Sequence, residues 1–217
     1  MMRLLFRIFG SLAALLIVFL VIGLLLPGTW SAESTVTLSA APGDVFPYLN
    51  DMERWDVWTP WGDMESTFDA HTAGVGARRS WNHPEFGSGS VTITESVLDR
   101  LVRYRVVVGD GLLSVEGTLV LEASEGGSTL TWSETGDFGW NPLLGYTALS
   151  MPRSQSAQLE RGLAALKLEL LARHRDETLV GAGLAHDTEQ LVHRVRRADI
   201  GQLAAHGLGY PESVIVE

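Results

Sequence analysis

Among the side chains of this 217-residue sequence that could transfer a proton, Glu95 is a leading candidate because of its place in the pattern. It lies in a stretch that alternates between polar and apolar residues like a β-strand. By that alternation Glu95 shares a face with Val91 and Ile93, and a carboxylate against an apolar wall has a raised pKa that suits an acid or a base. The alternative is an ion pair with Arg103 or Arg105 on the neighbouring strand.

His83, Tyr104, Arg79 and Asp137 complete the set of candidates for proton transfer or for polarising a carbonyl group. His83 precedes Pro84 at the expected end of a strand, so an ordinary loop histidine is the alternative there. The sequence contains no Ser/His/Asp order, phosphate-binding glycine loop or zinc-ligand spacing. It also contains no cysteine, which excludes thiol nucleophiles, disulfides and cysteine-ligated metals. We therefore predict no cofactor and no metal site.

Three of the seven tryptophans stand close together, at Trp55, Trp58 and Trp61. Tryptophans three residues apart lie on one side of a turn, so they form a large apolar wall with polar N–H tips. This wall is either a plug in the hydrophobic core or part of the lining of a ligand cavity.

Alternating residues and glycine turns indicate consecutive β-strands along most of the chain. The pattern predicts an antiparallel meander with one face packed on a helix. The expected strands are residues 34–40, 66–70, 77–83, 90–97, 100–108, 112–123 and 128–137. A short helix is expected from Pro42 to Asn50, followed by a helical turn over residues 52–55.

The long helix predicted over residues 153–173 is the one available to cover this sheet. Its apolar stripe recurs at helical spacing and consists of Leu159, Leu163, Leu166 and Leu170. Gly162 costs about 1 kcal/mol in a helix interior, which suggests either close approach of a strand or room left for a ligand. A shorter helical segment precedes this helix over residues 140–149, and Pro152 is expected to kink or break the two apart.

An uncharged apolar stretch, residues 8–26, is close to the ~20 residues that cross a bilayer as a helix. Arg3 and Arg7 precede it and the next basic residue is Arg54, so the positive-inside bias places the N-terminus in the cytoplasm. Trp30 stands where an interfacial aromatic anchor is expected. A cleaved signal peptide and a buried core helix are the alternatives. We predict a single-pass inner-membrane protein whose domain lies outside the cytoplasm.

The composition limits the kinds of partner that the protein can bind. A hydrophobic content of 46% is enough for the core of one domain. Acidic residues outnumber basic ones by 26 to 16, and the formal net charge is −10. An acidic domain is a poor binder of nucleic acid and of anionic lipid surfaces, because both carry negative phosphates. We predict no nucleic-acid partner, and the sequence identifies no protein partner.

Several short motifs occur in a fixed order along residues 31–173. They are Ala41-Pro42 to Val45-Phe46, Arg54-Trp55 with Trp58-Thr59-Pro60-Trp61, Gly74-Val75-Gly76-Ala77 to Trp81, Gly87-Ser88-Gly89 with Thr92-Ile93-Thr94-Glu95, Gly127-Ser128-Thr129 to Trp132, and Leu159-Glu160-Arg161-Gly162-Leu163. With the order of strands and helices, they make the chain resemble the START-like SRPBCC superfamily, in particular its polyketide cyclase/dehydrase and lipid-transport branch.

This resemblance implies an α+β helix-grip fold, in which a curved seven-stranded antiparallel sheet surrounds a long C-terminal helix, preceded by one transmembrane helix. The chain then divides into an N-terminal anchor (residues 1–30), a START-like domain (31–173) and a partly helical tail (174–217). The resemblance also implies an apolar cavity between sheet and helix. The residues expected to line it, as ligand contacts or as ordinary core, are Trp58, Trp61, Trp81, Tyr104, Val106, Trp132, Leu159 and Leu163.

The sequence and the resemblance together suggest three candidate functions. The first is a membrane-tethered, non-catalytic module that binds or transfers an apolar ligand, lipid-like or aromatic. The second is an enzyme of the cyclase/dehydratase type on an apolar substrate, with Glu95, His83 or Tyr104 as catalytic candidates. The third is a protein-interaction module of the cell envelope. A uniformly apolar lining favours the first, an acid–base pair facing the cavity the second, and a filled interior the third.

In the tail, His186, Glu189 and His193 fall near one face of a helix predicted over residues 184–205, a spacing that could bind a metal ion. Three such residues spread over two turns usually form a solvated face, and we favour that interpretation.

Overall fold

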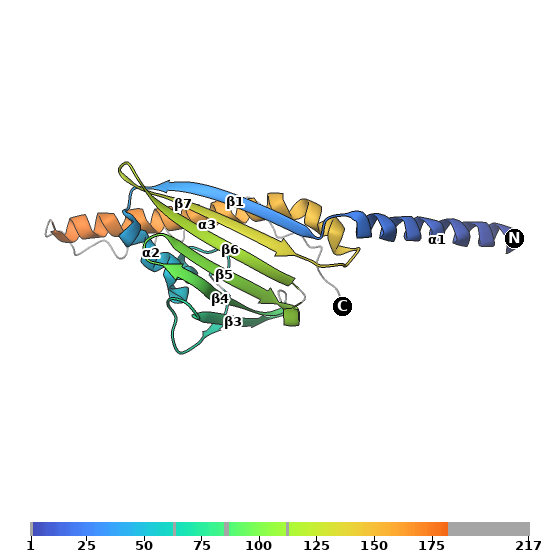
Figure 1. Ribbon diagram of the computed structural model, residues 1–217, viewed down its shortest axis with the longest axis horizontal. Coiled ribbons are helices and arrows are strands. Elements are labelled where there is room, and N and C mark those ends of the chain that lie inside the picture. Colours follow the sequence, from blue (N-terminus) through green and yellow to red (C-terminus); the bar gives the residue numbers. More distant parts are fainter. Residues whose placement is uncertain (1, 63, 85–86, 112, 182–217) are drawn as a thin grey trace. The chain divides into compact units, whose positions relative to one another are not determined.

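One large β-sheet dominates the computed structural model, which describes residues 2–62, 64–84, 87–111 and 113–181 (Figure 1). The chain forms two compact units, residues 1–166 and 167–217, and the sheet belongs to the first. The helix predicted over residues 184–205, with the histidines that could bind a metal, lies outside the described residues.

Seven strands form the sheet in the order β1-β7-β6-β5-β4-β3-β2, and each neighbouring pair is antiparallel. Strands β2 to β7 follow one another as a meander, and β1 lies beside β7 (Figure 1). Their bounds are β1 (Thr29–Leu38), β2 (Ser66–Phe68), β3 (Arg78–His83), β4 (Gly87–Val97), β5 (Leu101–Val108), β6 (Leu113–Ser124) and β7 (Gly127–Asp137). The predicted seven-stranded antiparallel sheet is confirmed.

The described helices are α1 (Met2–Leu25), α2 (Pro42–Asn50), the 3-10 helices η1 (Met52–Val57) and η2 (Gly109–Gly111), and α3 (Leu144–Gly181). Helix α2 begins with proline, whose fixed φ suits the first turn. Within α1, the 20 residues Phe6–Leu25 have a mean hydropathy of 2.9, so this helix is long and apolar enough to cross a membrane. A signal sequence would share both features.

Pro152 does not separate two helices, contrary to the prediction from the sequence. Helix α3 runs without interruption from Leu144 to Gly181, with Pro152 inside it. A proline in a helix removes one backbone hydrogen bond and crowds the preceding turn. Ala148 and Leu159, on either side of Pro152, are both buried, so packing holds the helix before and after the lost bond.

The hydrophobic core lies between α3 and the inner face of the sheet, the face from which Leu130 and Trp132 of β7 point. Both of these residues are fully buried, and Leu159 and Leu163 of α3 are almost fully buried. Leu159 and Leu163 of the predicted leucine stripe therefore face the sheet, as the helix-grip fold requires.

At Gly162, α3 packs closely against Trp132 of β7 and against the loop after η1. A Cβ atom on this residue would lie 2.7 Å from Cζ3 of Trp132 and 3.3 Å from both Cδ of Pro60 and the carbonyl oxygen of Trp58. Real Cβ atoms do not come within 3.0 Å of another heavy atom, so only glycine fits here. Of the two interpretations offered for Gly162, the structure supports close packing, because the Trp132 ring of β7 and the loop after η1 fill the space.

Three aromatic rings on the inner face lie over glycines of a neighbouring strand. The pairs are Trp30 of β1 with Gly136 of β7, Trp81 of β3 with Gly89 of β4, and Tyr104 of β5 with Gly117 of β6. A Cβ atom on these glycines would lie between 2.0 and 2.4 Å from the ring of its partner. Glycine weakens an isolated strand, but here each missing side chain makes room for a ring that the core needs.

Trp30 is therefore part of the core and not the interfacial anchor that its position after the apolar stretch suggested. It is 5% exposed, and its ring covers Gly136. Strand β1 begins at Thr29, only a few residues after α1 ends at Leu25, so pairing with β7 brings Trp30 into the sheet.

We expect the substitution Gly117→Ala to destabilise the protein, because the new methyl group would overlap the ring of Tyr104. Overpacking of this kind costs about 1–3 kcal/mol, and for a domain of this size each kcal/mol lowers the Tm by about 2–4 °C. Thermal unfolding of the detergent-solubilised protein measures the change.

Gly43→Ala is the matched control, because a Cβ atom there would make only an ordinary contact, 3.8 Å from Oδ2 of Asp99. Equal Tm values for the two variants would contradict the predicted role of Gly117.

Candidate functional site

A hydrogen-bonded group of four polar side chains lies between the sheet and α3. The Tyr104 hydroxyl donates to Oε1 of Glu134, and the Trp132 indole Nε1 donates to the Tyr104 hydroxyl at 2.7 Å. From α3, Nε2 of Gln155 donates to Oε2 of Glu134 at 2.6 Å. Tyr104 is 1% exposed and Glu134 is 3% exposed, so this is a carboxyl group and a phenol inside the core.

The register of the sheet brings Tyr104 and Glu134 together. Tyr104 lies opposite Gly117, and Gly117 lies opposite Glu134, so the three residues form one row across β5, β6 and β7. Neighbouring strands are about 4.8 Å apart, which puts two strand spacings between the ends of this row. Because Gly117 has no side chain, the Tyr104 ring can lie across β6 and reach β7.

Burial raises the pKa of Glu134, because the surrounding core disfavours a charged carboxylate; the hydrogen bonds from Tyr104 and Gln155 oppose this rise. Burial also raises the pKa of Tyr104 well above its usual value, and the neighbouring Glu134 adds to the effect. The phenol therefore keeps its proton, and Glu134 is the group of this pair that titrates.

The donors around Glu134 match its ionised form. Tyr104 and Gln155 each donate a hydrogen bond to one of its two carboxylate oxygens. When Glu134 takes up a proton, one of its oxygens becomes a donor and needs an acceptor. A flip of the Gln155 amide supplies one, because it exchanges an N–H donor for a carbonyl oxygen. Gln155 is half-buried, so it is the member of the group best able to rearrange.

Aromatic rings surround this polar group on the side of η1. The ring centroids of Trp55 and Tyr104 are 5.0 Å apart, and those of Trp58 and Trp132 are 5.2 Å apart, both in edge-to-face arrangements. The indole N–H groups of Trp55 and Trp58 donate to backbone carbonyls of α2, both at 3.0 Å. The tryptophan wall therefore fills the centre of the space between sheet and helix.

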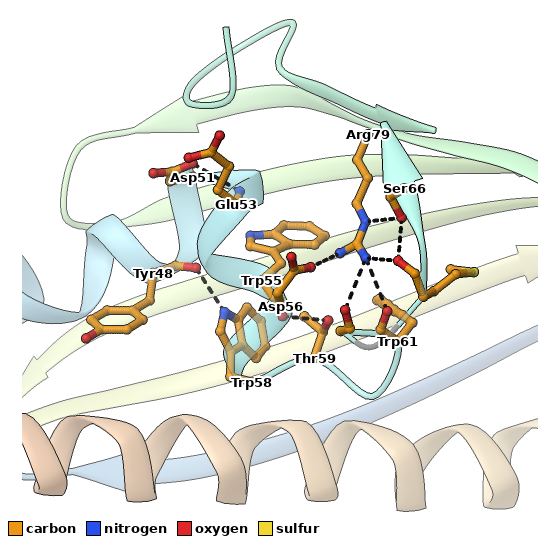
Figure 2. Close-up of polar contacts among 12 residues, drawn as sticks. Tyr48, Asp51, Glu53, Trp55, Asp56, Trp58, Thr59, Trp61, Ser66 and Arg79 are labelled. Atoms are coloured by element: carbon orange, nitrogen blue, oxygen red, sulfur yellow. Dashed lines mark hydrogen bonds and ion pairs between the residues drawn. The ribbon is translucent and has the colours of Figure 1, made fainter. Parts of the chain in front are cut away.

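Arg79 fixes the loop that carries the third tryptophan of this wall, Trp61 (Figure 2). Its guanidinium group forms an ion pair with Asp56 at 2.6 Å. It also donates to the Ser66 hydroxyl and to the backbone carbonyls of residues 61, 62 and 64. Burial lowers the pKa of Arg79 while Asp56 opposes the shift. With its N–H groups used in this way, Arg79 is suited to holding the loop and less suited to the chemistry suggested from the sequence.

Glu95 does not face the core, and the expectation from strand alternation is wrong there. The register of β4 against β5 shifts between Ile93 and Glu95, as in a β-bulge, and this turns Glu95 to the outer face. Its carboxylate lies 2.7 Å from Nη1 of Arg103, and both side chains are about half exposed. The alternative offered from the sequence, an ion pair with a neighbouring arginine, is the one observed.

His83 and Asp137 lie at strand ends, apart from the group around Glu134. His83 is the last residue of β3 and pairs with Gly87. Asp137 ends β7, and its Oδ1 accepts from the backbone N–H of Gly139 at 2.7 Å, which stabilises the turn after the strand.

The residues expected to line a cavity fall into two classes. Those at the centre are fully or almost fully buried: Trp58, Tyr104, Trp132, Leu159 and Leu163. Trp61, Trp81 and Val106 are half-buried. Whether any of them contacts a ligand stays a prediction.

Sequence analysis missed Glu134 and Gln155, although each had a signal. In β7 the inner residues alternate as Leu130, Trp132 and Glu134, so a carboxylate stands in phase with two large apolar residues. Gln155 lies four residues before Leu159 and so continues the buried stripe of α3.

A hollow of about 510 Å³ lies on the opposite, outer face of the sheet. Two exposed ion pairs line it, Glu95 with Arg103 and Arg105 with Glu116. Its charges are balanced and its walls are polar, so it does not fit an apolar ligand, and we place no site there.

We expect the stability of the wild-type protein to fall as pH rises from the ordinary Glu value of 4.5 through the raised pKa of Glu134. Below this window both folded and unfolded states hold the proton, whereas within it the unfolded state releases it more readily. Glu134→Gln, a neutral mimic of the protonated acid, should remove this dependence and be the more stable form above the window.

Urea unfolding over a series of pH values measures the effect. Glu122→Gln controls for the loss of one charge, because it removes an exposed carboxylate from the same sheet. The same pH slope in wild type and Glu134→Gln would show that Glu134 does not titrate as expected.

Two solved structures are similar to this chain. The di-domain ARO/CYC StfQ from the steffimycin biosynthetic pathway is 15% identical over 67% of this chain and 52% of its own, with a TM-score of 0.52. The protein CV1439 from Chromobacterium violaceum is 20% identical over 64% of this chain and 96% of its own, with a TM-score of 0.49. Similarity at this level of identity concerns the fold alone. No curated protein matches the sequence.

A family model described as "Polyketide cyclase / dehydrase and lipid transport" matches residues 29–170, from the first residue of β1 into α3. This range contains the whole sheet and all four members of the buried polar group. The chain therefore belongs to the polyketide cyclase/dehydrase and lipid transport family.

Proposed function

We propose that the domain binds an apolar ligand, lipid-like or aromatic, between the inner face of the sheet and α3, and that α1 anchors it in a membrane. The family description includes lipid transport beside cyclases and dehydrases. Apolar surface inside a concave sheet suits such a ligand, because its affinity comes mainly from the area removed from water.

The observation that supports this proposal is that the inner face is not covered uniformly. At its centre Tyr104 and Trp132 are almost completely buried, so side chains occupy the space there. Two residues further along β5, Val106 is half-buried, and so is Trp81 on β3. A ligand therefore fits best over the ends of β3 to β6 nearest η2, beside the filled centre and not in place of it.

Gln155 gives this location a polar end. It is half-buried and covers Glu134, which lies next to the apolar residues of β5 and β6. A ligand with one hydroxyl or carbonyl group could take over the hydrogen bond between Gln155 and Glu134. This arrangement favours amphipathic ligands, apolar over most of their surface with a single polar group.

Anchoring by α1 is supported by its length, its composition and its contacts. The Phe19 ring stacks on Tyr146 of α3 with centroids 4.5 Å apart, and the Tyr146 hydroxyl donates to the Phe19 carbonyl at 2.7 Å. Cleavage as a signal peptide would remove these contacts, so they favour a retained anchor. Arg3 and Arg7, in the first turns of α1, favour a cytoplasmic N-terminus and a domain on the other side of the membrane.

We expect Val106→Trp to reduce ligand uptake, because the larger side chain would occupy the partly exposed inner face. Native mass spectrometry of the detergent-extracted full-length protein, with and without a phospholipid extract or an aromatic probe, measures the bound fraction. Val107→Trp is the matched control, since it changes the next residue of the same strand, which points to the outer face.

Loss of binding in Val106→Trp with normal binding in Val107→Trp is the expected result. If the wild-type protein repeatedly purifies empty and takes up neither lipid nor probe, ligand binding is wrong. The filled centre of the domain would then favour a protein-interaction module of the cell envelope.

A second candidate is a cyclase or dehydratase, which the buried Tyr104–Glu134 pair favours. A buried carboxyl group whose pKa is raised holds its proton more tightly than an ordinary glutamate and is a stronger base once ionised, and the hydroxyl beside it can donate to a carbonyl oxygen. In this function Glu134 is the acid or base, Tyr104 holds it in position, and Gln155 moves aside for the substrate.

For the enzyme, we expect a bound substrate to change mass over time in the wild type, for example by loss of one water. Glu134→Gln should bind the same molecule and leave its mass unchanged, because the amide cannot exchange the proton. Mass spectrometry of the extracted ligand after incubation decides this. Turnover by Glu134→Gln at the wild-type rate would reject Glu134 as a catalytic residue.

A further inference from the structure

We propose that the start of α3 and the loop before it enter the same bilayer as α1, so that the domain touches the membrane at a second place. The residues that would meet lipid are Trp140, Leu143 and Leu149. This inference rests on the anchoring by α1 proposed above.

The start of α3 packs closely against the last turns of α1. A Cβ atom on Gly23 of α1 would lie 2.0 Å from the carbonyl oxygen of Pro142, and one on Gly145 would lie 2.7 Å from the carbonyl oxygen of Gly23. The two backbones therefore meet directly, in the manner of membrane helices that pack through small residues. The stacked rings of Phe19 and Tyr146 extend this contact by one more turn.

The position of these contacts along α1 sets their depth. The segment Phe6–Leu25 has 20 residues and is about 30 Å long, which only just equals the hydrocarbon thickness of a bilayer, about 30 Å. To span it, α1 must use its last turns as well. Phe19 lies about 9 Å before the end of α1, so residues packed beside Phe19 and Gly23 share the depth of those turns.

The loop and the first turns of α3 have the surface that such a location requires. Trp140 is 92% exposed, Leu143 is 55% exposed and Leu149 is 59% exposed, and the stretch from Phe138 to Pro152 contains no charged residue. Tryptophan is the residue most typical of the membrane interface. Trp140 thus has the role that sequence analysis gave to Trp30.

Three backbone N–H groups at the start of α3 and in the loop before it are hydrogen-bonded within the protein. The N–H of Leu143 donates to the Asn141 side chain at 3.0 Å, and the N–H groups of Leu144 and Gly145 donate to the Asn141 carbonyl at 3.1 and 3.2 Å. Peptide groups near lipid need such partners, because the bilayer core provides none.

A lipid bilayer fits these three side chains better than a protein partner does. Continuity with α1 fixes their distance from the membrane, whereas nothing in the described residues orients them toward another protein. The protein carries a net charge of −10, so attraction to anionic lipid does not contribute. Neutral phosphatidylcholine is therefore the bilayer of choice for a test.

The absence of cysteine allows single cysteines to be labelled with an environment-sensitive fluorophore in the full-length protein. Trp140→Cys and Leu143→Cys report the proposed contact in phosphatidylcholine nanodiscs. Leu16→Cys, on the exposed surface of α1, reports the anchor. Leu98→Cys, 73% exposed in the β4–β5 turn at the other end of the sheet, reports water.

We expect labels at positions 16, 140 and 143 to emit at shorter wavelength, to be quenched by spin-labelled lipid and to be protected from aqueous iodide. The label at position 98 should behave in the opposite way. If 140 and 143 respond to iodide as strongly as 98 while 16 stays protected, the second contact is wrong and the anchor stands. Iodide quenching at 16 as well would overturn the anchoring itself, and ligand uptake is measured independently of either result.

Discussion

The candidate site depends on one missing side chain, that of Gly117. Any larger residue at this position would occupy the space in which the Tyr104 ring lies, and the phenol could no longer cross β6 to reach Glu134. The carboxyl group would then lose a hydrogen-bond donor in a place where water cannot replace it, and an unsatisfied buried polar group is costly. The polar group under α3 is therefore a property of the sheet register as much as of the residues that form it.

Burying the carboxyl group of Glu134 in a small core destabilises the fold, and the groups around it reduce this loss of stability. Hydrogen-bond donors from strand β5 (Tyr104) and helix α3 (Gln155) converge on Glu134, and edge-to-face aromatic rings surround them. A similar arrangement satisfies the buried guanidinium of Arg79, which forms an ion pair with Asp56 of η1 and donates to several backbone carbonyls. Such polar groups specify a single packing, because any other register would leave them without partners. They also keep a proton-exchanging group next to apolar surface, which suits either binding or catalysis.

The sequence predicted the large elements, because their periodicity is strong. The leucine stripe of α3 and the alternating strands both follow from burial of one face. It failed where tertiary packing overrides a local pattern. A bulge reversed the face of Glu95, burial on both sides kept α3 intact through Pro152, and pairing with β7 drew Trp30 into the core. Glu134 occupies the same alternating position in β7 as the buried Leu130 and Trp132. From alternation alone, however, an acid at such a position could equally mean that the strand ends before it.

The three glycine–aromatic pairs also limit how this sheet can change over time. In each pair the ring fills the volume that the opposite residue gives up, so neither position can be altered alone. A side chain gained at the glycine displaces the ring, and a ring lost from the partner leaves a cavity. We therefore expect a change at one position of such a pair to require a compensating change at the other, so that the sum of their volumes stays the same. Diversity of ligands within this fold is then easier to reach at half-buried positions such as Val106, which have no fixed partner volume.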